Sequence, residues 1–362
     1  MRVLVVAGAS GGHIFPACSF IASLKEARPD IEVLLVLPKT NFAGHLAAKG
    51  YKIRYIATSS MPQRLDFKVF SALFNFMKGT LQSLFLLSGF CPEIVVGFGS
   101  LSSVALVIWA WLFRIKTLIH EQNVIPGTAN TLLAMFADSI ALSFPETGRY
   151  FQNYAKKIQI TGNPLRKELE IVDRGRAIGF FKLAADKFTI LLTGGSQGSR
   201  NLNNGFLRAV SGLKDRSVVQ IIHLAGSKDC ASLKDNYAGL GIEARVFDFL
   251  DKMHYAYSAS DILISRAGAT TISEAIFFQM PAIIVPYPFA HQHQLKNADV
   301  LKNRGCAVVV NDDELDTDKL KNTLRDFIDN PGKIKHMRAN YGSMPRLESG
   351  MLLAGQALSL IA

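Results

Sequence analysis

Cysteine is scarce in this chain, and the four that occur lie far apart, at positions 18, 91, 230 and 306, with no Cys-x-x-Cys pair. Structural zinc sites and disulfide-rich secreted domains depend on closely spaced cysteines. We therefore expect a reduced, cytosolic protein without structural zinc.

Long apolar runs are also missing, because no segment reaches the ~20 residues that a membrane-spanning helix needs. The best candidate, residues 101–113, is too short and is predicted to form a buried helix. The apolar first residues pass directly into a glycine turn, so we interpret them as a strand rather than a signal peptide.

Several ligand signatures are absent as well. No Gly-Lys-Ser/Thr follows the glycine-rich turns, which excludes a Walker A loop, and no Asp-x-Asp motif suited to a metal lies near them. No run of lysine and arginine interleaved with aromatic residues suggests a nucleic-acid groove. We expect no metal, no cofactor and no nucleic-acid partner.

Acidic residues are fewer than basic ones, since 29 Asp and Glu against 40 Lys and Arg give a net charge of +11. Residues 1–163 carry 15 basic and 8 acidic side chains, a net of +7, and the remainder carries 25 and 21, a net of +4. An anionic membrane surface is the partner that we prefer for this basic N-terminal half.

What the chain does contain is a regular alternation of strand and helix signals, typical of parallel sheets covered by helices on both faces. Its length and 49% hydrophobic content suffice for two domains. Residues 161–166 break the alternation, and Pro164 disfavours helix before it, so we place the linker there. Strands are predicted near residues 2–7, 32–37, 53–56, 94–97, 117–120, 139–142, 189–192, 219–224, 244–247, 262–264, 282–285 and 307–310.

Two glycine turns each follow a strand and open a helix. The first is Gly8-Ala9-Ser10-Gly11-Gly12-His13, and the second spans residues 193–200. Glycine permits positive φ and lets the backbone approach a phosphate closely. Two such turns, each opening its own βα series, predict two nucleotide-fold domains.

Polar residues gather after the strands predicted near 262–264 and 282–285. Glu274 lies in the first turns of the helix between these strands, and Gln294 and Asn297 follow the second one. The carboxyl edge of a parallel sheet is where such folds bind ligands, and a nucleotide fits there. Two interpretations of Glu274 remain open: it accepts hydrogen bonds from ribose hydroxyls, or it forms a capping box with Thr271.

Residues 67–90 contain six phenylalanines, and on a helix their apolar side chains cover nearly the whole circumference. Such a helix is either buried in a core or faces lipid on one side. Lys68, Lys78 and the nearby Arg64 favour lipid contact, so both interpretations stay open, and residues 64–90 are the expected membrane contact.

Five motifs together resemble the MurG family of bacterial N-acetylglucosaminyltransferases: GASGGH (8–13), HEQN (120–123), TGNPLR (161–166), TGGSQGSRNLN (193–203) and SRAGATTISE (265–274). The resemblance implies an α/β GT-B fold with two Rossmann-like domains facing a cleft. Residues 1–163 would form the acceptor-binding domain and 164–344 the donor-binding domain, with a last helix at about 345–362 returning to the first. The implied enzyme acts in peptidoglycan biosynthesis, peripherally on the cytoplasmic face of the inner membrane.

The implied reaction is inverting transfer of N-acetylglucosamine from UDP-N-acetylglucosamine to the 4-hydroxyl of undecaprenyl-diphospho-N-acetylmuramoyl-pentapeptide. By resemblance, Ser196 and Arg166 would meet the donor diphosphate, Leu250 the uracil, Glu274 the ribose and Gln294 the sugar hydroxyls. The other implied donor contacts are Ser10, Gly11, Gly12, Asn123, Ala269, Thr270, Thr271, Ile272 and Ser273.

His13 is our preferred general base, because the helix dipole at its position disfavours the imidazolium form. The open alternative is that His13 binds the acceptor diphosphate together with Gly97 and Gly99. Weaker candidates for the base are Glu121, His291 and His293.

The sequence departs from the family pattern at three places. Ala9 stands where glycine is usual, Ser100-Leu101 replaces Gly-Tyr, and His293 precedes Gln294 where an amide is common. The first two departures concern acceptor contacts, and the third leaves Gln294 intact.

Two other functions remain as alternatives. A UDP-sugar epimerase would bind the same nucleotide sugar without needing a lipid-facing surface. A non-catalytic subunit would bind nucleotide or lipid without turnover, although the complete set of donor motifs argues against it.

Overall fold

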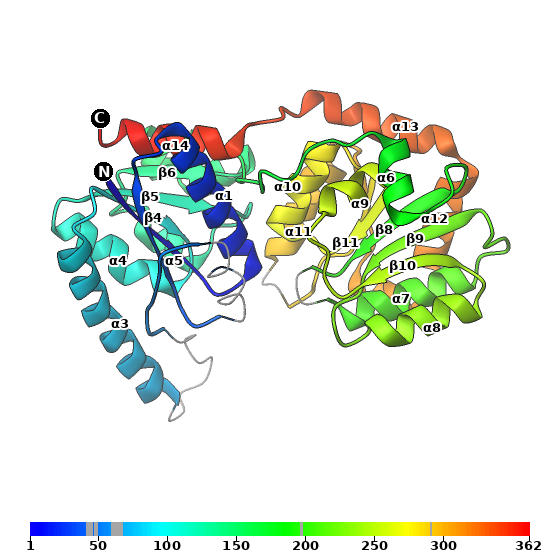
Figure 1. Ribbon diagram of the computed structural model, residues 1–362, viewed down its shortest axis with the longest axis horizontal. Helices are drawn as coiled ribbons and strands as arrows, with labels where there is room; N and C mark the ends of the chain where they lie inside the picture. Colours follow the sequence, from blue (N-terminus) through cyan, green and yellow to red (C-terminus); the bar gives the residue numbers. More distant parts are fainter. Residues whose placement is uncertain (41–45, 47–49, 59–67, 196–197, 290–291) are drawn as a thin grey trace. The chain divides into compact units, whose positions relative to one another are not determined.

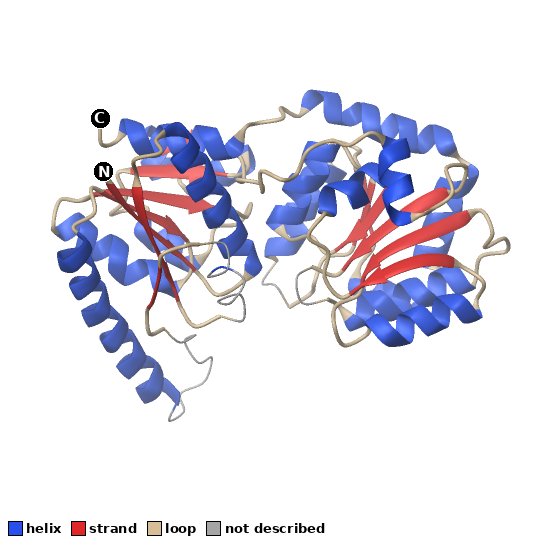
Figure 2. Cartoon of the chain, viewed as in Figure 1, coloured by secondary structure: helices blue, strands red, loops and turns tan. Residues whose placement is uncertain are grey.

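The computed structural model describes the 362 residues except 41–45, 47–49, 59–67, 196–197 and 290–291, and it divides them into two compact units. One unit comprises Met1–Arg166 with Leu347–Ala362, and the other comprises Lys167–Arg346. The division follows Arg166, whereas the predicted boundary followed Asn163. Each unit is a parallel sheet with helices on both faces (Figures 1 and 2).

The first unit is built on a seven-stranded sheet with the order β3-β2-β1-β4-β5-β6-β7. Its central strands β1, β4 and β5 are buried along almost their whole length, as expected for strands covered on both faces. The strands are β1 (Arg2–Ala7), β2 (Glu32–Leu37), β3 (Ile53–Tyr55), β4 (Ile94–Phe98), β5 (Lys116–Glu121), β6 (Ser139–Leu142) and β7 (Ile158–Ile160). The helices are α1 (Gly11–Ala27), α3 (Lys68–Phe90), α4 (Leu101–Leu112), α5 (Thr128–Leu133) and α14 (Ser349–Ser359), with 3-10 segments η1 (Pro145–Tyr150) and η2 (Gln152–Lys157).

The C-terminal helix α14 belongs to the first unit. Leu353, Ala354 and Ala357 join the core formed by α1 and β1. The buried Gln356 donates from Nε2 to Ser139 Oγ of β6, at 2.6 Å. The last helix therefore completes the core of the unit in which the chain begins.

The second unit has a six-stranded sheet with the order β10-β9-β8-β11-β12-β13. The strands are β8 (Phe188–Thr193), β9 (Val219–Leu224), β10 (Glu243–Phe247), β11 (Ile262–Ser265), β12 (Ala282–Ile284) and β13 (Ala307–Val309). The helices are α6 (Arg174–Phe181), α7 (Arg200–Ser211), α8 (Cys230–Gly239), α9 (Met253–Ala259), α10 (Ala269–Phe278), α11 (His293–Lys302), α12 (Lys319–Asp329) and α13 (Pro331–Asn340), with 3-10 segments η3 (Asp312–Asp316) and η4 (Tyr341–Ser343).

Every strand predicted from the sequence is present, and the strand that was not predicted is β7. Its sequence, Ile-Gln-Ile, is short, and its outer position in the sheet leaves its side chains partly exposed. Three residues carry too little apolar pattern to be distinguished from a loop.

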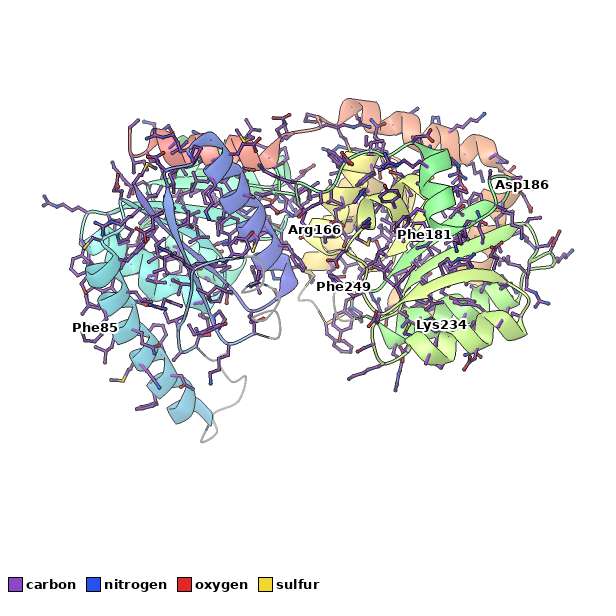
Figure 3. The ribbon with its side chains drawn as sticks, in the orientation of Figure 1. Phe85, Arg166, Phe181, Asp186, Lys234 and Phe249 are labelled. Atoms are coloured by element: carbon purple, nitrogen blue, oxygen red, sulfur yellow. The ribbon has the colours of Figure 1, made fainter. Side chains whose placement is uncertain are left out.

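Helix α3 corrects the interpretation of residues 67–90 as a core helix. Phe74, Met77, Leu81 and Phe85 recur at helical spacing and are exposed, with Phe74 at 68% and Phe85 at 72% of their full area. The side chain of Phe85 points away from the sheet in Figure 3. The opposite face, which includes the buried Ser83 and Leu87, packs on the unit.

Helix α4 is buried along most of its length, as predicted, but its end is not. Val104, Leu106, Val107 and Ala110 are buried, whereas Trp111 and the two residues after it are about half exposed. The exposed end of α4 and the outer face of α3 both belong to the first unit.

Candidate active site

His13 lies in the first turn of α1, where the glycine turn after β1 brings the helix close to the loop after β4. The carbonyl of Ser10 accepts hydrogen bonds from the backbone N–H groups of His13 and Ile14, both at 3.0 Å. A Cβ atom at Gly8 would lie 2.7 Å from Ser100 Cβ and 2.8 Å from His13 Nδ1, so only glycine fits there.

The His13 ring is held on one side and borders Gly99 on the other. Its Nδ1 lies 2.9 Å from Ser10 Oγ. A Cβ atom at Gly99 would lie 3.5 Å from His13 Nε2. Burial lowers the pKa of His13 to about 4, so the ring is neutral at pH 7. When Nδ1 carries the hydrogen and donates it to Ser10, Nε2 is the atom that can accept a proton.

The predicted acceptor glycines occupy different environments. Gly99 has a φ of +77° and lies beside His13, as a phosphate-binding turn requires. Gly97 lies inside β4, where a Cβ atom would approach Val107 and Ser103 of α4 at 3.3 and 3.4 Å. Gly97 therefore serves the packing of α4 on the sheet.

Ser100, one of the three departures from the family pattern, has a φ of 72° and a ψ of 158°. This backbone region is adopted almost only by glycine, and a residue with a side chain is strained there. The strain is located directly between Gly99 and the first turn of α4.

Glu121 anchors the loop after β5. Its carboxylate accepts hydrogen bonds from the N–H groups of Asn123 (2.9 Å) and Gly127 (3.0 Å) and from Asn130 Nδ2 (2.8 Å). Burial raises the pKa of Glu121, and these hydrogen bonds act in the opposite direction. Because both oxygens already accept hydrogen bonds within the loop, Glu121 positions Asn123 and is a poor candidate for the base.

The neighbouring His120 also has a structural role. Gln122 Nε2 donates to its Nδ1 at 3.0 Å, and its Nε2 donates to the Gly162 carbonyl at 3.0 Å. Burial lowers the pKa of His120 to about 4. The HEQN motif is thus tied to the TGNPLR motif within the first unit.

Asn130 joins β5 to α5, and no motif in the sequence pointed to it. Its amide donates to the His120 carbonyl and to Glu121, while its buried Oδ1 has no hydrogen-bond partner among the described residues. A buried asparagine in a short helix two turns after HEQN is the signal that could have identified it.

Arg166 is the last residue of the first unit, and its guanidinium lies 5.6 Å from the ring centre of Phe15 on α1. Phe15 is two residues after His13 in the sequence. The cation is therefore held near the first turns of α1 (Figure 3).

The second unit has its own glycine turn, between β8 and α7. Gly195 and Gly198 have φ values of +85° and +71°, and the Gly198 N–H donates to the Gly195 carbonyl at 3.0 Å. A Cβ atom at Gly194 would collide with the backbone nitrogen of Ser199. The predicted diphosphate contact Ser196 lies outside the described residues, as does His291.

Helix α10 settles one of the two interpretations of Glu274. The helix starts after Gly268, so Thr271 is inside it, and the capping-box interpretation is wrong. Glu274 is 7% exposed, and its Oε2 accepts a hydrogen bond of 2.7 Å from Tyr257. The carboxylate is thus fixed in position by a neighbouring helix.

The other predicted donor residues of α10 differ in exposure. Ala269 and Ile272 are buried, with Ile272 wholly inside the core, so these two can meet a ligand through the backbone only. Thr270, Thr271 and Ser273 are half-buried, and Ser273 Oγ donates to the Ala269 carbonyl.

Gln294 connects the loops after β11 and β12. Its Oε1 accepts from the N–H groups of Ala267 (3.0 Å) and Tyr287 (2.9 Å). The nearby Asn297 donates to the Ala267 carbonyl. A sugar hydroxyl would therefore be met by the amide nitrogen of Gln294. Leu250, the predicted uracil contact, is half-buried and follows Phe249 in the loop after β10 (Figure 3).

The structure therefore groups the predicted residues by unit. Ser10, Gly11, Gly12, His13 and Gly99 lie together at the glycine turns of the first unit, with Asn123 on the loop that Glu121 anchors. In the described parts of the chain, no three His, Cys, Asp or Glu side chains form a group that could hold a metal ion.

Comparisons with known proteins agree with this arrangement. Residues 3–142 match the glycosyltransferase family 28 N-terminal domain, and residues 189–349 match its C-terminal domain. The UDP-N-acetylglucosamine–N-acetylmuramyl-(pentapeptide) pyrophosphoryl-undecaprenol N-acetylglucosamine transferase of Halothermothrix orenii is 34% identical over 346 residues, which is 93% of each chain.

Solved structures show the same fold. The crystal structure of MurG from Acinetobacter baumannii superposes with a TM-score of 0.77 at 24% identity, covering 99% of this chain and 100% of that one. The crystal structure of UDP-N-acetylglucosamine 2-epimerase from Neisseria meningitidis superposes with a TM-score of 0.66 at 14% identity, covering 100% of this chain and 99% of that one. The two parallel-sheet domains have the GT-B fold, and the chain belongs to glycosyltransferase family 28.

Proposed function

We propose that this protein transfers N-acetylglucosamine from UDP-N-acetylglucosamine to the 4-hydroxyl of undecaprenyl-diphospho-N-acetylmuramoyl-pentapeptide. The observation that carries this proposal is the 34% identity, over 93% of each chain, to a relative named for that reaction. The polar residues Glu274 in the second unit and His13 in the first are present and held by neighbouring side chains. The reaction belongs to peptidoglycan biosynthesis.

The second unit binds the donor. The N–H groups of the glycine turn and of the first turn of α7 receive the diphosphate, because a helix N-terminus stabilises negative charge. Glu274 accepts hydrogen bonds from the ribose, and Tyr257 keeps its carboxylate in place. Leu250 offers its backbone to the uracil, and the Gln294 amide nitrogen donates to a sugar hydroxyl.

The remaining donor contacts come from the first unit. They are Arg166, which assists the leaving diphosphate with its positive charge, Asn123, and the turn Ser10-Gly11-Gly12. In the second unit, Ser196 and residues 269–273 complete the set.

The first unit supplies the base. The 4-hydroxyl gives its proton to His13 Nε2 as its oxygen bonds to C1 of the sugar, and the bond between C1 and the diphosphate oxygen breaks to release UDP. One displacement inverts the configuration at C1. The lowered pKa of His13 supports this role, because a ring that is neutral at pH 7 has a free lone pair.

His13 also has a second candidate role, as a ligand of the acceptor diphosphate beside Gly99. The position of Nε2 next to that positive-φ glycine favours this role as much as the first. The two roles differ in kinetics, since a base acts on kcat and a ligand acts on the acceptor KM.

The outer face of α3 is the membrane contact in this proposal. Phe74, Met77, Leu81 and Phe85 present an exposed apolar stripe, and Lys78 is exposed on the same helix. No helix among the described residues has the length and hydropathy to cross a bilayer. The protein binds peripherally at the cytoplasmic face of the inner membrane, through apolar insertion and attraction to anionic lipid, and takes no nucleic-acid partner.

The test is UDP release from UDP-N-acetylglucosamine with and without a lipid-linked muramoyl acceptor. We expect release that requires the acceptor. Formation of an epimer without acceptor would identify an epimerase, and absence of turnover under both conditions would identify a binding subunit. Either result would overturn the proposal.

A further inference from the structure

The residue directly after β11 is a buried arginine that contacts several loops. Arg266 is 6% exposed, and its Nε and Nη2 lie 3.1 and 2.8 Å from Ser199 Oγ, to which they donate. Its Nη1 donates to the carbonyl of Val285 at 3.2 Å. One guanidinium group thus joins the residue before α7 to the end of β12.

The partner of this arginine is Asp312, the first residue of η3. Asp312 Oδ1 lies 2.5 Å from Arg266 Nη1. Its other oxygen, Oδ2, accepts a hydrogen bond of 2.7 Å from Asn201 Nδ2, in the first turn of α7. The Arg266–Asp312 pair therefore reaches the N-terminus of α7 by two routes, through Ser199 and through Asn201.

The two routes hold Ser199, which directly follows the positive-φ Gly198, and Asn201 in the first turn of α7. Donors that stabilise negative charge are effective only when they are fixed before the ligand arrives. Arg266 is 6% exposed and its Nε and Nη2 both donate to Ser199, so the pair is positioned to act through the start of α7.

We propose that Arg266 and Asp312 form a positioning pair that fixes Ser199 and the N-terminus of α7 to receive the diphosphate of a nucleotide. The inference rests on the donor site proposed above. It predicts an effect that depends on the diphosphate, because uracil and ribose are bound by Leu250 and Glu274 and not by α7.

The choice of variant follows from the burial of the pair. Removing one partner of a buried ion pair leaves an uncompensated charge and can unfold a protein. Asn201→Ala avoids this problem, because Asn201 is exposed and its loss leaves Arg266 and Asp312 paired. Asn204→Ala is the matched control, since Asn204 is an exposed asparagine on the same helix.

The experiment measures the affinities of the full-length protein for UDP and for uridine by calorimetry. Asn201→Ala should weaken UDP binding roughly tenfold, the equivalent of about 1.4 kcal/mol for one hydrogen bond to a charged group. Uridine affinity should not change, and Asn204→Ala should match the wild type for both ligands.

Equal weakening of UDP and uridine binding by Asn201→Ala, or unchanged UDP affinity, would overturn the positioning role. A wild-type protein that binds neither ligand would instead remove the proposed donor site itself. The wild-type measurement therefore separates failure of the proposed function from failure of this inference.

Discussion

The two units share one sheet topology and use it for different chemistry. β1 and β8 occupy the same position in their sheets, as do β4 and β11, and β5 and β12. In the first unit the loops after these strands bring together a neutral histidine and a strained serine. In the second unit, Arg266 after β11 pairs with Asp312 after β13, and helix α10 after β11 carries the buried carboxylate Glu274.

The comparison shows that the position of a strand in the sheet does not determine the chemistry of the side chains that follow it. The carboxyl edge of a parallel sheet supplies helix N-termini and open loops in both units. The side chains then decide the role: in the function proposed above, the second unit holds a charged nucleotide, and the first accepts a proton and contacts lipid. Each prediction below tests one side of this comparison.

The largest effect is expected from His13→Ala. Loss of a general base lowers kcat by roughly 10²–10⁴-fold. UDP affinity should stay nearly the same, because His13 is not among the proposed donor contacts. Steady-state kinetics with both substrates varied, together with UDP calorimetry, checks this prediction.

Ser10→Ala is the companion variant to His13→Ala, and its KM for UDP-N-acetylglucosamine is measured as well, because Ser10 is also a proposed donor contact. It keeps the ring but removes the partner of Nδ1, so a smaller loss of kcat is expected. A rise in the acceptor KM without a change in kcat in His13→Ala would assign His13 to the acceptor diphosphate instead.

The second prediction concerns the lipid-facing side of the first unit. The triple variant Phe74→Ser, Lys78→Glu and Phe85→Ser should no longer sediment with anionic liposomes. Each inserted phenylalanine contributes about 1.5–3 kcal/mol and each lysine near an anionic surface about 1 kcal/mol. Activity on a short water-soluble acceptor should survive, since these residues are exposed on α3.

A matched control for this variant is Leu352→Ser, which removes an exposed apolar residue from α14. Liposome binding should be unaffected. Retained binding by a folded triple variant would show that α3 is not the membrane contact.

The third prediction tests the ribose carboxylate of the second unit. Glu274→Gln should raise the KM for UDP-N-acetylglucosamine, because a hydrogen bond to a charged group contributes about 1.5–3 kcal/mol. Tyr257→Phe, which removes the group that fixes the carboxylate, should have a smaller effect of the same kind. A variant that loses only thermal stability and keeps its donor affinity would contradict the ribose role.

The sequence predicts some features of the two units and not others. The strands were found because each is a short apolar run, and several of these runs end at glycine or proline. The outer face of α3 could not be decided, because a helix that is apolar all round has no polar face to orient it. The capping-box alternative failed because α10 begins at Ala269, earlier than the Thr-x-x-Glu spacing indicated.

The hydrogen-bond and ion-pair networks could not be predicted from the sequence, for a different reason. Glu121 looked like a possible base, yet its carboxylate is satisfied by Asn123, Gly127 and Asn130. The Arg266–Asp312 pair joins residues that are far apart in the chain. Such partners depend on packing distances, which no local pattern encodes.

Lowering the pH should have a smaller effect, which is a decrease in the free energy of unfolding. Burial lowers the pKa of His13 and His120 to about 4 in the first unit and that of His223 to about 3 in the second. The unfolded chain therefore binds these protons first, and stability is lost as the pH falls from about 6.5 toward 4. Each group contributes up to about 1.4 kcal/mol per pH unit.

Urea unfolding at several pH values in this range measures how steeply the free energy of unfolding changes with pH. His13→Ala should show a shallower decrease than the wild type, because one of the depressed groups is gone. An identical slope in the two proteins would contradict the lowered pKa of His13.

The smallest effect should come from relieving the strain at Ser100. Ser100→Gly should stabilise the protein by about 1 kcal/mol, since glycine adopts this φ and ψ without a steric cost. The equivalent residue before α10, Gly268, has an ordinary φ of −64°, so Gly268→Ala should not be strained. Thermal unfolding of both variants checks the contrast, and a less stable Ser100→Gly would refute it.

The most direct test of the account is the structure of the product formed from UDP-N-acetylglucosamine and the lipid-linked muramoyl acceptor. A base in the first unit and a bound α-linked donor in the second predict a single displacement, so nuclear magnetic resonance should show a β-linkage to the 4-hydroxyl of the muramoyl sugar. An α-linked disaccharide, free N-acetylglucosamine or an epimerised nucleotide sugar would contradict it.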